Sequence, residues 1–301
     1  MSEPQVKKAT KVLVVGQTGQ LAKALADAVP LRESIEMTVL GRPDIDLTNP
    51  GLVREVLKRV RPDVVVNASA YTAVDKAETD HELAYQVNAQ GVEVLAKACA
   101  DGGAQFIHVS TDYVFDGSGT EPYKPEDMVS PLGAYGASKL KGEELALAAL
   151  ASSVIIRTSW VYGDEGSNFV STMLRLAESR DELGIVADQL GRPTYASDLA
   201  GAILDIVPAL DGSQGGVYHY SNEGEVTSWH GFAEAIFRTS EEYGARVPDT
   251  VRAITTAEYP TPAKRPAWSV LDLEKIKNVF SISIPDWNDS LATYFKKKET
   301  K

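Results

Sequence analysis

The sequence has little cysteine, no long apolar run and no excess of positive charge. Cys99 is its one cysteine, so an internal disulfide is excluded, and the apolar stretch around it predicts a buried, unreactive thiol. No apolar run approaches the roughly 20 residues that a membrane-spanning helix needs. Acidic residues outnumber basic ones by 42 to 30, which argues against non-specific nucleic-acid binding. We therefore expect neither a nucleic acid nor a membrane as a partner.

The N-terminus lacks the apolar segment of a secretory signal. Its first ten residues are polar and carry lysine, and we expect them to form a frayed leader before the first strand. A single cysteine also suits a reducing compartment. The cytoplasm is therefore the expected location.

Short β-branched segments alternate with helical ones through the first half of the chain. The expected strands are 11–15, 37–40, 63–67, 106–110 and 154–157, and the expected helices are 20–29, 50–60, 82–100 and 135–150. Alternation with short connections is typical of an α/β fold with a doubly wound parallel sheet.

The second half of the chain has a less regular pattern. Prolines interrupt shorter segments after about Thr158, and clear helices are expected only at 169–178, 197–207 and 229–243. We expect one domain over 1–157, to which a segment near 185–207 returns. A second, smaller α/β domain is expected over 158–301.

A glycine-bearing turn follows the first expected strand. Small residues there let the backbone approach a pyrophosphate at the N-terminus of the next helix. A plain strand–helix turn also uses glycine, but the position directly after a strand makes the pattern more specific. Its spacing resembles that of the short-chain dehydrogenase/reductase superfamily. The residues expected to bind the dinucleotide here are Gly16, Gln17, Thr18, Gly19, Gln20 and Leu21.

The end of the second strand bears on the identity of the dinucleotide. It reads Leu40-Gly41-Arg42, with no acidic residue before Asp44. A carboxylate there would repel a ribose 2′-phosphate, whereas an arginine can pair with it. We therefore expect NADPH, with NADH as the alternative; Arg42 as a mere solvated loop charge is the competing interpretation.

Two further segments are expected to contact the cofactor. Asp46 and Leu47 stand where the superfamily usually contacts the adenine. The third strand ends in small residues that suit backbone passing under a cofactor, namely Ala68, Ser69 and Ala70.

Tyr135 and Lys139 have the Tyr-x-x-x-Lys spacing of the same superfamily. Residues four apart share one face of a helix. A free phenol has a pKa of about 10, and a nearby ammonium and an oxidised nicotinamide would lower it. The pair therefore predicts proton transfer beside a nicotinamide. A hydroxyl at the end of the fourth strand, Ser110 or Thr111, should hold the substrate carbonyl.

Several longer blocks make the resemblance more specific. They are NASAYTAVDK at 67–76, STDYVFDG at 110–117, RTSWVYG at 157–163, DQLGRPT at 188–194 and AKRP at 263–266. Together, in this order, they resemble the dTDP-4-dehydrorhamnose reductases over nearly the whole chain. The resemblance implies a Rossmann-like domain with a smaller C-terminal substrate-binding domain. It also implies NADPH-dependent reduction of the C4 ketone of dTDP-4-dehydro-β-L-rhamnose to dTDP-L-rhamnose.

The resemblance assigns roles to individual residues. Thr111, Tyr135 and Lys139 would form the catalytic trio, with Ser110 pointing into the sheet. The residues around the dTDP-sugar would be Thr72, Val74, Tyr113 and Trp160. Flat aromatic faces suit a sugar ring, although core packing is the alternative for Trp160. Arg265 is a candidate for the diphosphate.

Other members of the superfamily remain as alternatives. Related dehydratases carry a glutamate after Thr-Asp, where this chain has Tyr113, so loss of water is not expected. A reductase or epimerase for another nucleotide-sugar would keep the same trio. A regulatory protein resembling the β subunit of methionine adenosyltransferase would be non-catalytic.

Some relatives are metal-dependent dimers held by glutamates, one of them on the first helix. This chain has Lys23 and Ala24 near that place, and its four histidines lack ligand spacing. We expect no metal, and either a monomer or a homodimer.

Overall fold

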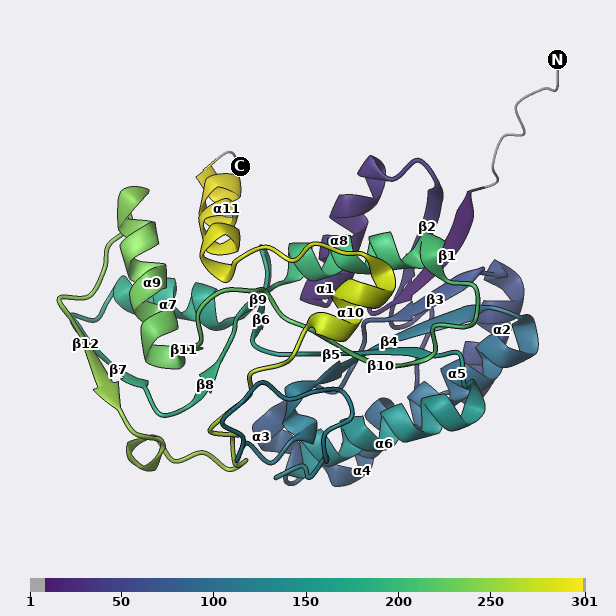
Figure 1. The fold of residues 1–301 in the computed structure, drawn as a ribbon, viewed down its shortest axis with the longest axis horizontal. Helices are drawn as coiled ribbons and strands as arrows, with labels where there is room; N and C mark the ends of the chain where they lie inside the picture. The colour runs from purple at the N-terminus through teal and green to yellow at the C-terminus, as the bar shows by residue number, and fades with distance from the viewer. Residues whose placement is uncertain (1–8, 300–301) are drawn as a thin grey trace, which may run out of the picture.

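A six-stranded parallel sheet forms the centre of the molecule (Figure 1). The computed structural model describes residues 9–299. The leader expected over the first ten residues therefore lies almost entirely outside the described part. The strands of the sheet are β1 (Thr10–Val15), β2 (Ile35–Leu40), β3 (Val64–Asn67), β4 (Gln105–Thr111), β5 (Val154–Thr158) and β10 (Gly216–Tyr220). Their spatial order is β10-β5-β4-β3-β1-β2, which confirms the doubly wound parallel sheet.

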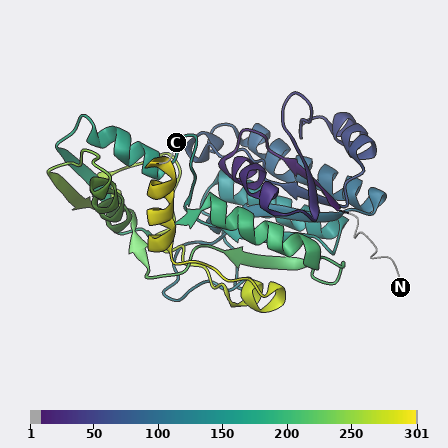
Figure 2. The ribbon, with the colours of Figure 1, turned by 90° about the horizontal axis from the view of Figure 1, so that it is seen from above.

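Helices cover both faces of this sheet (Figures 1 and 2). The two faces are built from alternating residues, because successive side chains of a strand point in opposite directions. On β1, Val12 and Val14 belong to the apolar cluster with α1 and α8, whereas Leu13 and Val15 belong to the cluster with α2 and α5. The main helices of this half are α1 (Gln20–Ala28), α2 (Pro50–Val60), α5 (Gly91–Gly102), α6 (Ala134–Ala149) and α8 (Ala196–Ile206). Cys99 lies buried in the second cluster, where desolvation raises the pKa of its thiol to about 12, as an unreactive thiol requires.

The chain reverses direction across the sheet between β1 and β3. From β1 it moves outward to β2 and then returns to β3 on the other side of β1. The connections that leave the carboxyl ends of β1 and β3 therefore run in opposite directions, and a crevice lies between them. Open α/β sheets bind ligands at such a switch point.

The long helix expected over 82–100 is interrupted. It consists of α4 (His81–Tyr85), a π-helical segment (Gln86–Gln90) and α5. Asn88 lies in the π segment, accepts from the Tyr71 amide at 2.8 Å and donates to Ser138 of α6 at 3.0 Å. Helix α6 approaches closely here, since a Cβ on Gly142 would lie 2.0 Å from the Asn88 carbonyl oxygen. These contacts between distant segments account for a break that local periodicity does not signal.

The chain returns to the first half over a longer stretch than 185–207. Helix α8 packs on α1, and β10 then pairs with β5 along the sheet edge. The sixth strand was missed because its sequence, Gly-Val-Tyr-His-Tyr, follows a glycine-rich loop within the irregular half. Helix α10 (Glu274–Phe280) packs beside β10.

A second lobe stands at one end of the sheet (Figures 1 and 2). Its apolar core contains Tyr162, Tyr195, Phe232, Trp287 and Tyr294. Its main elements are α7 (Phe169–Ala177), α9 (Trp229–Glu242), α11 (Trp287–Glu299) and the parallel pair β7 (Glu182–Val186) and β12 (Thr250–Ile254). Two shorter pairs also lie in the second half of the chain, namely β6 (Val161–Tyr162) with β9 (Thr194–Tyr195) and β8 (Leu190–Gly191) with β11 (Thr227–Ser228).

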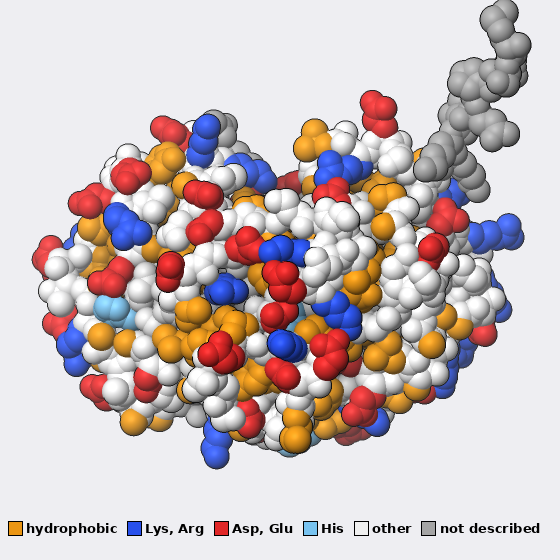
Figure 3. Space-filling view, viewed as in Figure 1, with side chains coloured by type: hydrophobic (Ala, Val, Ile, Leu, Met, Phe, Trp, Pro, Cys, Tyr) orange, Lys and Arg blue, Asp and Glu red, His pale blue; other side chains and the backbone are white. Residues whose placement is uncertain are grey.

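Charge is distributed evenly over the visible surface. Acidic and basic side chains are intermixed on the face shown in Figure 3, despite a net charge of −12. Within residues 9–299, no helix has the length and apolar character needed to cross a membrane.

Candidate active site

A cleft of about 1020 Å³ lies over the carboxyl ends of the sheet strands, at the switch point between β1 and β3. Segments from both halves of the chain line it. Those expected from the sequence to bind the dinucleotide lie along it, as do Thr111, Tyr135, Lys139, Thr72, Val74, Tyr113 and Trp160. The cleft reaches from Gly41, at the end of β2, to Trp160, which packs against the second lobe.

The glycine turn forms one wall of the cleft. Gly16 has a φ of +129°, and a Cβ there would lie 2.9 Å from the backbone of Ala68 and Ser69. A side chain at this position would therefore push the β1 and β3 loops apart. Helix α1 begins after Gly19 with no side-chain cap and no acidic residue in its first turn. Its first amides and its dipole therefore suit a pyrophosphate.

The end of β2 forms the adenosine end of the cleft. Arg42 is exposed and lines the cleft beside Gly41 and Asp46. Hydrogen bonds from the Thr48 amide at 2.9 Å and hydroxyl at 2.8 Å lower the pKa of Asp46, and the nearby Arg42 adds to that effect. Arg42 and Asp46 share this loop, and their charges interact across it. These residues can hold the adenosine and 2′-phosphate of an NADP(H) molecule.

Helix α6 carries Tyr135 and Lys139 into the cleft. Its N-terminus is held by the Glu78 carboxylate, which accepts from the Ala134 amide at 2.8 Å. Close approach to the end of β4 is possible because position 136 is glycine, where a Cβ would lie 2.1 Å from the Tyr113 carbonyl oxygen. These two contacts position the helix face that carries Tyr135 and Lys139 against β4.

Thr111 ends β4 beside the Tyr135 phenol. Its hydroxyl accepts from the Tyr113 amide at 3.2 Å and donates to Asp112 at 3.0 Å. Burial raises the pKa of Asp112 to about 7, although hydrogen bonds, including the one from Thr111, lower it in part. Ser110 does not point into the sheet as expected. It faces α6, where its hydroxyl donates to the Glu143 carboxylate.

The pKa of Tyr135 differs from the sequence-based expectation. Desolvation raises it to about 12, while the hydrogen bond with Thr111 lowers it in part. Lys139 was expected to lower this pKa, but its ammonium turns away to the Val109 carbonyl, 2.7 Å distant. Desolvation in turn lowers the pKa of Lys139 to about 8. The Tyr135 phenol is consequently protonated at neutral pH.

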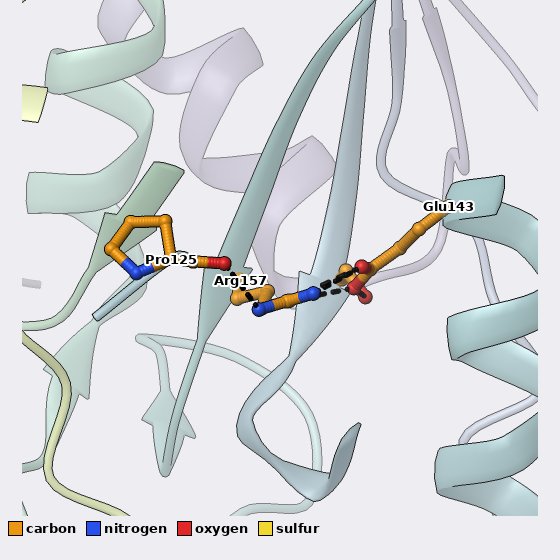
Figure 4. Close-up of polar contacts among 4 residues, drawn as sticks. Pro125, Glu143 and Arg157 are labelled. Atoms are coloured by element: carbon orange, nitrogen blue, oxygen red, sulfur yellow. Dashed lines mark hydrogen bonds and ion pairs between the residues drawn. The ribbon is translucent and has the colours of Figure 1, made fainter. Parts of the chain in front are cut away.

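A buried ion pair supports α6 from behind (Figure 4). Arg157 of β5 donates to the Glu143 carboxylate, with distances of 2.7 Å from Nη2 and 3.0 Å from Nε. It also donates to the Pro125 carbonyl at 3.3 Å, and both charged side chains are almost fully buried. Sequence patterns did not reveal this pair, since its two members are separated along the chain.

The substrate side of the cleft is lined by aromatic rings. Tyr113 meets Tyr135 edge to face, with ring centroids 5.6 Å apart. Trp160 has a φ of +48° and stacks on Trp229 with centroids 3.7 Å apart, so it both packs and faces the cleft. Trp229 had not been expected near the site.

Arg265 lies beside the cleft rather than in its lining. Its guanidinium pairs with Asp75 at 3.1 Å, next to Val74, which does line the cleft. The Arg265 charge also acts on the Tyr113 phenol. A diphosphate would therefore meet an arginine that is already partly neutralised.

Several lining residues were not expected. They include Ile45, Tyr71, Leu83, Thr158, Ser167 and Leu199. Only Thr158 carried a usable signal, because it ends a buried strand at the ligand-binding edge of the sheet. Among the described residues, no group of three or more His, Cys, Asp or Glu side chains is arranged to hold a metal ion.

The chain is similar to known proteins over nearly its whole length. The family described as RmlD substrate binding domain matches residues 10–300. A dTDP-4-dehydrorhamnose reductase of Aggregatibacter actinomycetemcomitans is 44% identical over 93% of this chain and 97% of its own length.

Two solved structures are also similar over nearly their whole length. The dTDP-4-dehydrorhamnose reductase of Clostridium acetobutylicum has a TM-score of 0.90 and 37% identity, covering 96% of this chain and 100% of that one. The Bacillus anthracis reductase in complex with NADP has a TM-score of 0.89 and 35% identity, covering 96% and 99%.

Proposed function

This chain belongs to the dTDP-4-dehydrorhamnose reductase family, and we propose that Thr111, Tyr135 and Lys139 carry its reaction. The reaction is NADPH-dependent reduction of the C4 ketone of dTDP-4-dehydro-β-L-rhamnose to dTDP-L-rhamnose. The observation that supports the residue roles is the meeting of the Thr111 hydroxyl and the Tyr135 phenol in the cleft beside the glycine turn.

The residues around the nucleotide-binding half of the cleft suit NADP(H). We propose that the amides after Gly16 hold the pyrophosphate, that Arg42 pairs with the 2′-phosphate, and that Asp46 and Leu47 border the adenine. When bound, the reduced nicotinamide supplies the hydride that the carbonyl carbon receives.

Thr111 and Tyr135 act on the ketone oxygen. The Thr111 hydroxyl turns its hydrogen from Asp112 to that oxygen and orients it, and the Tyr135 phenol donates a second hydrogen bond to it. As the oxygen becomes negative during reduction, the phenol transfers its proton and an alcohol forms. With a pKa of about 12 the phenol holds its proton at neutral pH, and the negative charge that develops on the ketone oxygen draws that proton across. We propose that Lys139, one turn along the same helix face, returns a proton to the phenolate.

The sugar nucleotide would occupy the aromatic end of the cleft. We propose that Tyr113 and Trp160 pack against the deoxyhexose ring and that Thr72 and Val74 border it. Arg265 would reach the diphosphate after exchanging its Asp75 partner for a phosphate oxygen.

The direct test follows NADPH absorbance with purified protein and a panel of keto-sugar nucleotides. Oxidation of NADPH should require the dTDP-4-dehydro sugar, and NMR should identify the product as dTDP-L-rhamnose. Faster turnover of another nucleotide-sugar would identify that sugar as the substrate instead. No oxidation with any of them would favour a regulatory protein.

Arg42→Ala tests the proposed 2′-phosphate contact. A charge-assisted hydrogen bond contributes enough for roughly a tenfold weaker NADPH affinity after its loss, while NADH affinity should stay nearly constant. Dissociation constants measured by cofactor fluorescence give both values. Arg54→Ala removes an exposed arginine from α2, outside the cleft lining, and serves as the matched control. Equal weakening of both cofactors in R42A would contradict the assignment.

The surroundings of this reaction follow from its chemistry. Both the sugar nucleotide and NADPH are multiply charged and do not cross membranes unaided, so we propose a cytoplasmic enzyme acting as a monomer or homodimer. Light scattering of the purified chain distinguishes the two assembly states.

A further inference from the structure

A line of three buried polar side chains stands behind the catalytic lysine. Lys139 lies with its Nζ 3.2 Å from His108 Nε2, and the other ring nitrogen of His108 lies 3.0 Å from the amide of Asn67. All three side chains are essentially inaccessible to water. The mechanism proposed above assigns a role to Lys139 and none to His108 or Asn67.

The orientation of the Asn67 amide is set by a backbone group. The Ser69 amide N–H can only donate, and it donates to Asn67 Oδ1 at 3.1 Å. The Ser69 hydroxyl donates to the same oxygen at 2.8 Å. The opposite end of the amide, Nδ2, therefore faces His108 and donates to its Nδ1.

This donation selects one tautomer of His108. A neutral imidazole has one donor and one acceptor nitrogen, so an accepting Nδ1 leaves the proton on Nε2. Burial, the largest effect, holds the pKa of His108 well below its usual value, which keeps the ring neutral. The Nε2–H then points at Lys139.

The charge state of Lys139 decides whether this contact is favourable. An ammonium has no acceptor, so two donors would face each other across 3.2 Å. An amine has a lone pair that can accept from Nε2–H while one of its own hydrogens still goes to the Val109 carbonyl. The arrangement therefore favours the uncharged amine.

We propose that His108 is a positioning residue that donates its Nε2–H to Lys139 and stabilises the amine, so that Lys139 readily gives up a proton during reduction. The inference rests on the proposed role of Lys139. The ketone oxygen gains the Tyr135 proton, and the phenolate regains a proton from the Lys139 ammonium through an intervening water, because Lys139 itself faces the Val109 carbonyl. Solvent later restores that ammonium. Asn67 holds the histidine in the required tautomer.

The other ionisable groups near Lys139 act in both directions. Tyr135 and Glu143 share its helix, Asp112 follows β4, and Arg157 of β5 neutralises much of Glu143. Glu143 favours the ammonium, whereas burial, the larger effect, favours the amine. A donor at His108 adds to the effect of burial.

Nitrogen NMR of histidine-labelled protein tests the tautomer directly. We expect the His108 ring to show a protonated Nε2 and an unprotonated Nδ1, with and without NADP⁺. The signals are assigned by their loss in His108→Gln. A protonated Nδ1 would overturn the inference, and since no substrate is involved, that outcome is independent of reductase activity.

The pH profile of kcat tests the effect on Lys139. In His108→Gln the side-chain oxygen can accept from both Asn67 and the ammonium, so the basic limb of the profile should move up by about one pH unit. The maximal kcat should fall roughly threefold to tenfold, because the ammonium becomes a weaker acid. His219→Gln is the matched control, since His219 is equally buried on β10 but contacts the Tyr123 carbonyl instead.

A second variant covers the case in which His108→Gln folds poorly. Asn67→Asp replaces the donor at Nδ1 by an acceptor, which should move the imidazole proton to Nδ1 and raise the basic limb as well. If the variants lower kcat but leave the basic limb of the pH profile in place, His108 has a purely structural role and the proposal is refuted.

Discussion

Replacing Tyr135 by phenylalanine is expected to lower kcat for ketone reduction by about two to four orders of magnitude. The phenol is the only group proposed to transfer a proton to the ketone oxygen, and phenylalanine removes its hydroxyl alone. The ring, and its edge-to-face contact with Tyr113, would remain. The dissociation constant for NADPH should therefore change little. Steady-state kinetics with the dTDP-4-dehydro sugar and fluorescence titration with NADPH measure the two quantities.

Tyr71→Phe is the matched control for this substitution. Tyr71 also lines the cleft, but its hydroxyl donates to Asp80 at 2.9 Å, at an exposed position. Loss of that hydroxyl should leave kcat within about threefold of the parent value, as expected for a group that does not stabilise the transition state. Near-normal turnover in Tyr135→Phe would remove Tyr135 from the mechanism, whatever the family of the protein.

Replacing Arg157 by methionine is expected to lower the free energy of unfolding by about 3–5 kcal/mol. Arg157 is the charged partner of Glu143, and both side chains are almost fully buried. Methionine fills much of the same volume but leaves a carboxylate in the interior without its counter-ion. Urea denaturation followed by circular dichroism gives the difference.

The double variant Glu143→Gln with Arg157→Met separates charge from packing. Glutamine removes the unpaired charge and keeps an oxygen to which Ser110 can donate. More than half of the lost stability should therefore return, because a buried pair replaced by neutral groups often costs little. A double variant as unstable as Arg157→Met would instead mean that the arginine acts through shape, including its contact with the Phe115 ring 5.1 Å away.

Local pattern predicted much of the first half of the fold. The first five strands were placed within two residues of their observed starts, because β-branched runs bounded by polar residues have few alternatives. Helix α2 starts at Pro50 as expected, and the Asn49 side chain caps it by accepting from the Leu52 amide. Strand β10 and the π segment at Gln86–Gln90 were missed, since each depends on packing against a segment distant in sequence.

The site shows the same division between spacing and packing. The glycine turn and the Tyr-x-x-x-Lys pair follow from residue types at fixed offsets, and both line the cleft. The protonation states and the orientations of those side chains do not follow from spacing. Desolvation raises the pKa of Tyr135, and Lys139 turns to the Val109 carbonyl rather than to the phenol.

By itself, the sequence determined the α/β alternation, the nucleotide turn and the pair Tyr135 and Lys139, because these depend on periodicity and on backbone reach within a few residues. The tertiary structure alone decided what stands behind that pair. His108, Asn67 and the ion pair of Glu143 with Arg157 come from different strands and from the helix above them. Water is excluded where these elements meet, and the resulting loss of solvation sets the protonation of the catalytic groups.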